Sequence, residues 1–228
     1  MFAWTTDDLQ ILRLSVSVAA LATLAALGPA IAVATLLARR RFWGHSAVNA
    51  IVHLPLVLPP VVTGYFLLRA FGTRGPIGGW LADTLGLVFA FRWTGAVLAA
   101  AVMGFPLMVR AIRSSIESVD PRLEEAAASL GASPTWRLLT ITLPLAAPGI
   151  LAGAILGFAK ALGEFGATIT FVSNIPGETQ TLALAIYSLT QTPGGDAGVW
   201  RLAALSVCVS FVALVAADTL ARRTAVRR

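Results

Sequence analysis

The chain has 228 residues, of which 57% are hydrophobic and 12% are charged, and its net charge is +6. Soluble domains carry about 25% charged residues, so this composition excludes an ordinary soluble domain and indicates a polytopic membrane protein. The positive charge is almost all Arg at the ends of hydrophobic runs, a pattern typical of membrane topology rather than of nucleic-acid binding. One Cys and two His exclude an intrachain disulfide and a structural zinc site, and we expect no metal site.

Crossing a bilayer takes about 20 apolar residues. The stretches that meet or approach this length are residues 14–37, 48–68, 93–109, 145–172 and 202–217. Residues 80–91 and 181–189 are apolar but too short, so we expect interfacial or re-entrant half-helices there. The sequence therefore predicts an all-α polytopic membrane protein with five to six transmembrane helices, forming a single transmembrane domain over residues 1–228.

The Arg residues are distributed unequally between the two sides of these spans. One side holds the Arg residues that follow the first, third and fifth spans, namely Arg39, Arg40, Arg41, Arg110, Arg113, Arg122, Arg137, Arg222, Arg223, Arg227 and Arg228. The other side has Arg13, Arg69, Arg74, Arg92 and Arg201. Loops rich in Arg stay in the cytoplasm, so we expect the N-terminus outside and the C-terminus inside.

Residues 120–144 form the most polar segment of the chain and fall on the predicted cytoplasmic side. Asp120 and Pro121 predict a helix start, with acidic residues in the first turns. Gly131 is expected to end this helix or to allow close approach of another group. Pro134 starts a second short helix, which we expect Pro144 to stop. Such a segment is either a solvated connector or a surface that docks into a groove of another protein.

The spacing favours docking. Glu-Ala-Ala, three residues, Gly, nine residues and Ile-x-Leu-Pro resembles the signature of ABC importer permeases, which implies their type I, MetI-like fold. In that family this segment is the coupling helix, which rests in a cleft of a cytoplasmic ATPase. The resemblance implies ATPase-coupling residues Glu124, Glu125, Ala126, Ala127, Gly131, Ile141, Leu143 and Pro144.

The chain has no phosphate-binding loop of its own. That loop requires Gly-x4-Gly-Lys-Ser/Thr, whereas the only Lys is Lys160 and Ala161 follows it. We therefore expect no enzymatic activity and no bound cofactor in this chain, with ATP and Mg²⁺ held by a partner ATPase.

Two further stretches resemble the molybdate branch of the oxyanion ABC permeases. They are HLPLVLPPVVTGY at 53–65 and ALGEFGATITFVSNIPGETQTL at 161–182, together with FPLMVRAIR and QTPGG. Gly-Glu-Phe-Gly-Ala is shared with sulfate and thiosulfate permeases, so a sulfate, thiosulfate or other oxyanion remains the alternative cargo. Tungstate is nearly the same size and charge as molybdate and is not distinguished from it.

Prolines and small residues mark the second and fourth spans. Pro55, Pro59 and Pro60 each remove a backbone donor, which is tolerated in a membrane where a helix faces protein or a water-filled path. A simple kink is the alternative. Gly157, Gly163 and Gly166 are expected to allow close helix packing.

Lys160 and Glu164 lie one helical turn apart in the fourth span, where charges are costly and usually paired. Either Lys160 attracts an oxyanion while Glu164 tunes its release, or the two form an ion pair that fixes packing at a dimer interface, which we favour. The candidate path residues are Pro59, Pro60, Lys160, Glu164, Thr168, Thr170, Ser173 and Asn174.

The expected partners follow from the resemblance and from size. One small chain cannot enclose a path, so we expect a second copy of it, a cytoplasmic ABC ATPase dimer and membrane lipid in the bacterial inner membrane, and no nucleic acid. A periplasmic or extracytoplasmic oxyanion-binding protein is expected to dock near residues 73–79 and 174–179.

Three other classes are less well supported by the residues. A secondary transporter usually has inverted repeats and coupling-ion sites, which the sequence does not clearly show. A membrane enzyme would need a catalytic constellation, and His45 and His53 are isolated. A channel would leave the coupling motif unexplained.

Overall fold

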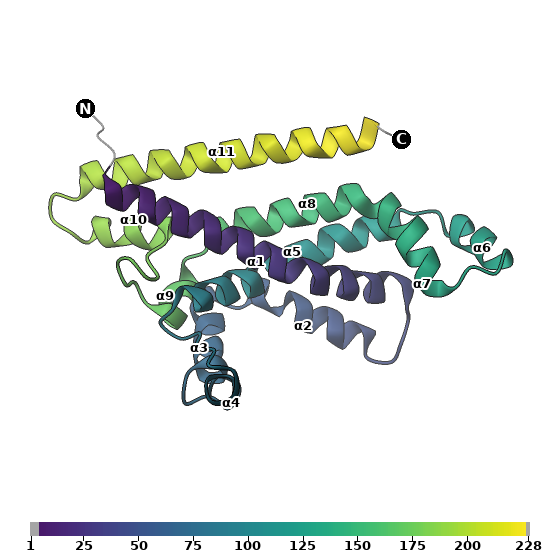
Figure 1. The fold of residues 1–228 in the computed structure, drawn as a ribbon, viewed down its shortest axis with the longest axis horizontal. Helices are drawn as coiled ribbons and strands as arrows, with labels where there is room; N and C mark the ends of the chain where they lie inside the picture. The colour runs from purple at the N-terminus through teal and green to yellow at the C-terminus, as the bar shows by residue number, and fades with distance from the viewer. Residues whose placement is uncertain (1–4, 227–228) are drawn as a thin grey trace.

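The computed structural model describes residues 5–226, and this part of the chain is helical with no strand (Figure 1). The elements in chain order are α1 (Thr6–Arg39), α2 (His45–Val57), α3 (Pro60–Phe71), α4 (Pro76–Leu85), α5 (Trp93–Glu117), α6 (Pro121–Ser129), α7 (Pro134–Arg137), the π-helical segment η1 (Leu138–Thr142), α8 (Leu143–Leu162), α9 (Gly166–Val172), α10 (Leu182–Thr190) and α11 (Asp196–Val226). The all-α prediction is confirmed.

Within the described residues, four helical segments are long and apolar enough to cross a membrane: Thr6–Arg39, Trp93–Glu117, Pro134–Leu162 and Asp196–Ala213. A fifth span results if α2 and α3, bent by 113° at Leu58 and Pro59, count as one. Of the predicted five to six spans, helix length therefore supports five, with the bent pair counted as one. The short stretches form α4 and α10, and neither is long enough to span.

Two predicted span boundaries were wrong. The fourth span does not continue to Val172, because its helix ends at Leu162 and α9 begins separately at Gly166. The second span is not one helix, because Pro59 and Pro60 occupy the joint where α2 ends and α3 begins. Proline at a first helical position lacks only a donor that would be unpaired anyway, so a new helix starts there readily.

The centre of the molecule is α5, which packs against α1 on one side and α8 on the other. The contact face of α1 is a stripe of fully or almost fully buried alanines at Ala22, Ala26, Ala30 and Ala34. Residues four apart share one face of a helix, and small side chains let two helices approach closely without a hydrophobic driving force. The Ala-rich composition of α1 therefore has a packing role.

Glycines perform the same function on α8. Built onto Gly149, a Cβ atom would lie 2.1 Å from the Ser115 Cβ of α5, and on Gly153 it would lie 3.1 Å from the Met108 carbonyl oxygen. The predicted close packing is confirmed at Gly157, whose Cβ would lie 2.6 Å from the Met108 Sδ. It was wrong at Gly163, where the nearest atom is the Ala159 oxygen of its own helix at 3.8 Å.

A second close contact joins the two broken spans. A Cβ on Gly64 of α3 would lie 2.5 Å from the Ala167 carbonyl oxygen of α9, and a Cβ on Gly166 would lie 2.6 Å from Pro60 Cβ. The packing predicted for Gly166 is thus confirmed. The distal halves of the second and fourth spans therefore lie against each other.

One end of the molecule gathers the predicted cytoplasmic elements. Helices α6 and α7 lie at the end of the structure toward which α1 and α11 run, whereas α4, α9 and α10 lie toward the other end (Figure 1). The last two residues of the basic tail, Arg227 and Arg228, lie outside the described residues.

Candidate coupling segment and translocation path

The local signals of the coupling segment form as predicted up to residue 134. Asp120 caps α6 by accepting a hydrogen bond from the Arg122 amide at 2.9 Å, and Ser133 caps α7 by accepting one from the Trp136 amide at 3.3 Å. Between them Gly131 has a φ of 85°, in the left-handed region that favours glycine. The helix, glycine turn and second helix are therefore confirmed.

Pro144 does not stop the second helix, contrary to the prediction. Helix runs from Pro134 to Leu162, interrupted only by the π-helical segment η1, in which the Leu143 amide bonds to the Leu138 carbonyl. Proline in a helix interior removes a donor and crowds the carbonyl four residues before it. A single π turn widens the backbone at this point, so the helix continues. Leu143 and Pro144 therefore belong to the start of α8.

The turn and its two helices enclose a concavity of about 640 Å³. Four motif residues line it, namely Ala126, Ala127, Gly131 and Ile141. Beside them Leu130 is 89% exposed and Trp136 is 53% exposed. The motif spacing thus brings small side chains together under two projecting apolar ones, which suits the insertion of another protein's side chains. Their role in docking an ATPase stays a prediction.

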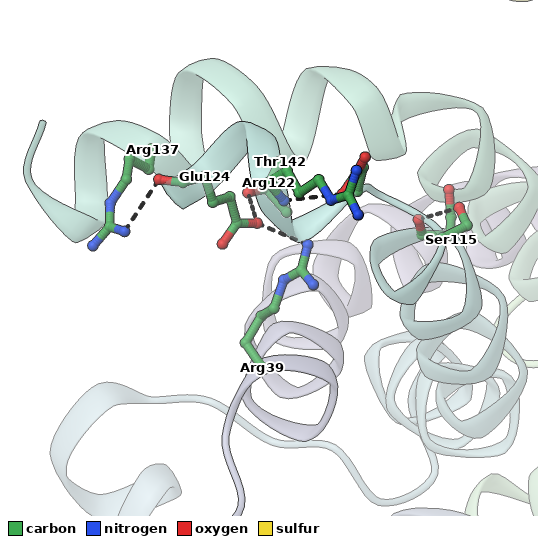
Figure 2. Close-up of polar contacts among 8 residues, drawn as sticks. Arg39, Ser115, Arg122, Glu124, Arg137 and Thr142 are labelled. Atoms are coloured by element: carbon green, nitrogen blue, oxygen red, sulfur yellow. Dashed lines mark hydrogen bonds and ion pairs between the residues drawn. The ribbon is translucent and has the colours of Figure 1, made fainter. Parts of the chain in front are cut away.

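The two adjacent glutamates point differently. Glu125 is exposed. Glu124 faces the rest of the chain, where its Oε1 lies 2.7 Å from Arg39 Nη2 and accepts a hydrogen bond from Thr142 Oγ1 at 2.6 Å (Figure 2). Sequence reasoning missed Arg39 and Thr142 at this site, because no local pattern relates them to Glu124.

The candidate path residues surround the breaks in the second and fourth spans. Pro59 and Pro60 form the joint between α2 and α3, and Lys160 and Glu164 flank the end of α8. Thr168 lies in α9 and is only 2% exposed, so its side chain is packed inside the chain in this conformation.

The remaining candidates make bonds within the chain. Thr170 donates to the Gly166 carbonyl at 2.9 Å, and Asn174 Nδ2 donates to Ser188 Oγ of α10. Ser173 has a φ of 62°, which is uncommon for a residue with a side chain and turns the backbone sharply after α9. Whether these groups line a path stays a prediction.

Lys160 and Glu164 form an ion pair, as we favoured, while its place at a dimer interface stays a prediction. Lys160 Nζ lies 2.5 Å from Glu164 Oε2, while Glu164 Oε1 accepts a hydrogen bond from the Ala167 amide at 3.0 Å. Both carboxylate oxygens are therefore used inside the chain, one to neutralise Lys160 and one to begin α9. This leaves Glu164 poorly suited to bind cargo directly.

Lys160→Met is expected to lower the free energy of unfolding by about 2 kcal/mol, because it leaves the carboxylate of Glu164, which is 3% exposed, without a counter-charge. Thermal unfolding in detergent measures the effect. The double variant Lys160→Met/Glu164→Gln should recover most of the loss. If Lys160→Met unfolds like the wild type but loses transport, the lysine acts in the path instead.

Comparison with known proteins identifies the family. Residues 30–226 match the family described as binding-protein-dependent transport system inner membrane component. The molybdenum transport system permease protein ModB of Escherichia coli K12 is 55% identical over 219 residues, covering 96% of this chain and 95% of that protein. ModB of Haemophilus influenzae is 54% identical over 217 residues, covering 95% and 94%.

A solved structure shows the same fold. The bacterial alginate ABC transporter, in complex with an alginate pentasaccharide-bound periplasmic protein, matches with a TM-score of 0.75 at 18% identity, covering 96% of this chain and 80% of that one. The similarity of fold and of sequence extends over the coupling segment, the broken spans and the close-packed core. The chain therefore belongs to the family of binding-protein-dependent transport system inner membrane components, the multi-pass inner-membrane permease subunits of ABC importers.

Proposed function

We propose that this chain is the membrane subunit of an ATP-driven molybdate importer. The observation that carries the proposal is the 55% identity to a molybdenum transport permease over 96% of the chain. The geometry supports it, since four residues of the coupling motif line one concavity in α6 and α7, at the end of the molecule where a cytoplasmic ATPase would dock. Tungstate, with nearly the same size and charge, is expected to share the path.

The mechanism is alternating access by a pair of these chains. ATP, bound with Mg²⁺ on two partner ATPase subunits, closes the ATPase dimer and draws the two coupling segments together. Because α7, η1 and α8 are one continuous helix and α8 packs tightly on α5, this movement passes directly into the spans. The paired spans open outward to receive the anion, and hydrolysis resets them inward.

The topology of the proposal places the N-terminus outside and the C-terminus in the cytoplasm. The Arg39–Arg41 loop, α6 and α7 then share the cytoplasmic side, in agreement with the positive-inside rule. The opposite face presents the loops on which a binding protein would deliver its anion.

Cargo passes between neutral donors in this proposal. Once the spans move apart, the anion is bound weakly by hydrogen bonds from the hydroxyl and amide groups of Thr168, Thr170, Ser173 and Asn174. A carboxylate would repel the anion, and Glu164 is already paired with Lys160. Tight binding is left to the external binding protein.

Exchanging residues 73–79 and 175–178 for unrelated loops, with Asn174 retained, is expected to abolish transport while the ATPase subunit still co-purifies. Ile175, Pro176 and Gly177 are exposed at the tip of the second loop, whereas Thr179 beneath them is fully buried and should be kept. Anion uptake and pull-down of the binding protein measure the effect. Normal uptake after the exchange would contradict docking at these loops.

The proposed cargo is tested by vanadate-sensitive ATPase activity. The chain is reconstituted with its ATPase subunit and supplied with binding protein loaded with molybdate or with sulfate. Stimulation by the molybdate-loaded protein alone is expected. Stimulation by the sulfate-loaded protein would move the cargo to sulfate while leaving the coupling mechanism in place.

A further inference from the structure

Glu124 connects three parts of the chain at the base of the coupling segment (Figure 2). Its Oε1 meets Arg39, the last residue of α1, at 2.7 Å and the hydroxyl of Thr142 in η1 at 2.6 Å. Its backbone carbonyl accepts a hydrogen bond from Arg137 Nη1 of α7 at 3.4 Å. Thr142 is 1% exposed, so its hydroxyl is fixed in place under α6.

These polar contacts, rather than packed side chains, join α6 to α1. Helix α6 packs on α7 and η1, but among the described residues it makes no broad packing contact with α1. A cavity of about 450 Å³ lies beside the junction, lined in part by Arg39, Glu124 and Thr142. The Arg39 and Glu124 side chains are 22% and 24% exposed. Both side chains therefore reach the cavity in part, while Arg39 Nη2, the atom that meets Glu124, is itself buried.

The neighbouring glutamate has a different environment. Glu125 is exposed, and no ion pair or hydrogen bond to its side chain is found in the described part of the chain. Its carboxylate is therefore available to a partner, whereas that of Glu124 is occupied within the chain. Two adjacent acidic residues of the coupling motif thus face opposite ways.

We infer that the Arg39–Glu124 pair is an internal latch through which the coupling segment moves α1. Glu124 is then a positioning residue for α1 and not a contact for the ATPase. The segment is continuous with α5 and α8 through the backbone, and among the described residues the Arg39–Glu124 pair is the ion pair that joins it directly to α1. Since α1 also packs along α5 by its alanine stripe, the latch gives α6 a direct connection to a helix of the packed core. The inference rests on the proposed function.

The test compares Arg39→Gln, Glu124→Gln and the double variant in the complete transporter. The readout is the ratio of ATPase activity with and without loaded binding protein. Each single variant is expected to lower this ratio about twofold to fivefold, the range for a partly exposed ion pair. The double variant should fall no further, because all three remove the same contact. Co-purification of the ATPase subunit should be unchanged.

Arg40→Gln is the matched control. Arg40 is the next residue, is exposed and has no ion pair with any described residue, so its loss should leave the ratio unchanged. Hydrogen–deuterium exchange of the full chain in nanodiscs gives a second readout. Amides of residues 121–129 should exchange faster in Arg39→Gln than in the wild type or Arg40→Gln.

Three results would overturn the latch. The first is that the effects of the two single variants on the stimulation ratio multiply in the double variant. The second is that amide exchange in Arg39→Gln equals that of the wild type. The third is that Glu124→Gln loses co-purification of the ATPase subunit while Arg39→Gln has no effect. Absence of stimulation in the wild-type complex is a separate outcome, measured first, which would contradict the proposed function itself.

Discussion

Gly149→Val is expected to prevent accumulation of the folded permease. A Cβ at this position would lie 2.1 Å from the Ser115 Cβ and 3.2 Å from the Ala111 carbonyl, both on α5. Neither atom is the flexible end of a long side chain, so the two helices would have to separate. Overpacking costs about 1–3 kcal/mol in ordinary cores, and we expect the upper end of this range or more here. The loss is measured as the yield of membrane-inserted protein that stays folded in detergent.

The matched control for this substitution is Gly28→Val. Gly28 also lies inside a long apolar helix, α1, but nothing lies within 4 Å of its Cβ position. It should therefore be made and folded like the wild type. Equal yield and melting temperature for Gly149→Val and the wild type would show that the contact between α5 and α8 is not as close as described.

Gly131→Val is expected to abolish stimulation of the ATPase by loaded binding protein. The φ of 85° at Gly131 costs an ordinary residue about 1–2 kcal/mol, and a β-branched one more. The turn between α6 and α7 would rearrange, which would separate the motif residues that share the concavity. ATPase activity of the reconstituted complex measures the effect.

Gly131→Asn distinguishes two possible roles of this glycine, namely its left-handed backbone conformation and the room that it leaves for the ATPase. Asn is close to Val in size but tolerates the left-handed conformation, and nothing in this chain lies within 4 Å of the Cβ position. If the backbone conformation is what matters, Asn should retain most of the coupling. If the ATPase approaches this position closely, both variants should be equally defective. Full coupling in Gly131→Val would contradict the assigned role of the turn.

Features set by short-range chemistry could be predicted from the sequence. The caps at Asp120 and Ser133 and the turn at Gly131 depend on residues a few positions apart, and all three form as expected. The Lys160–Glu164 pair is also local, since the residues are one turn apart on a helix. Composition located the apolar spans, although it did not fix where the second and fourth spans break.

Other features depend on where distant elements meet. Three prolines in the second span predicted either a kink or a helix facing a water-filled path. The break lies at Pro59 and Pro60, and its angle of 113° and its packing against α9 depend on the fourth span. The helix through Pro144 required a π turn that no residue pattern specified. The pairing of Arg39 with Glu124 depends on how α1 and α5 end side by side. The Gly149, Gly153 and Gly157 spacing was readable as a packing motif, but only Gly157 was recognised.

The most direct test of the account is uptake of labelled molybdate into proteoliposomes. The vesicles contain this chain and its ATPase subunit, with ATP inside and loaded binding protein outside. The account predicts uptake that requires both ATP and the binding protein and that is lost in Gly131→Val. Excess sulfate-loaded binding protein should reduce this uptake only as far as it competes for the docking site. Uptake that needs no ATP and follows an imposed proton or sodium gradient would contradict it and would identify a secondary transporter.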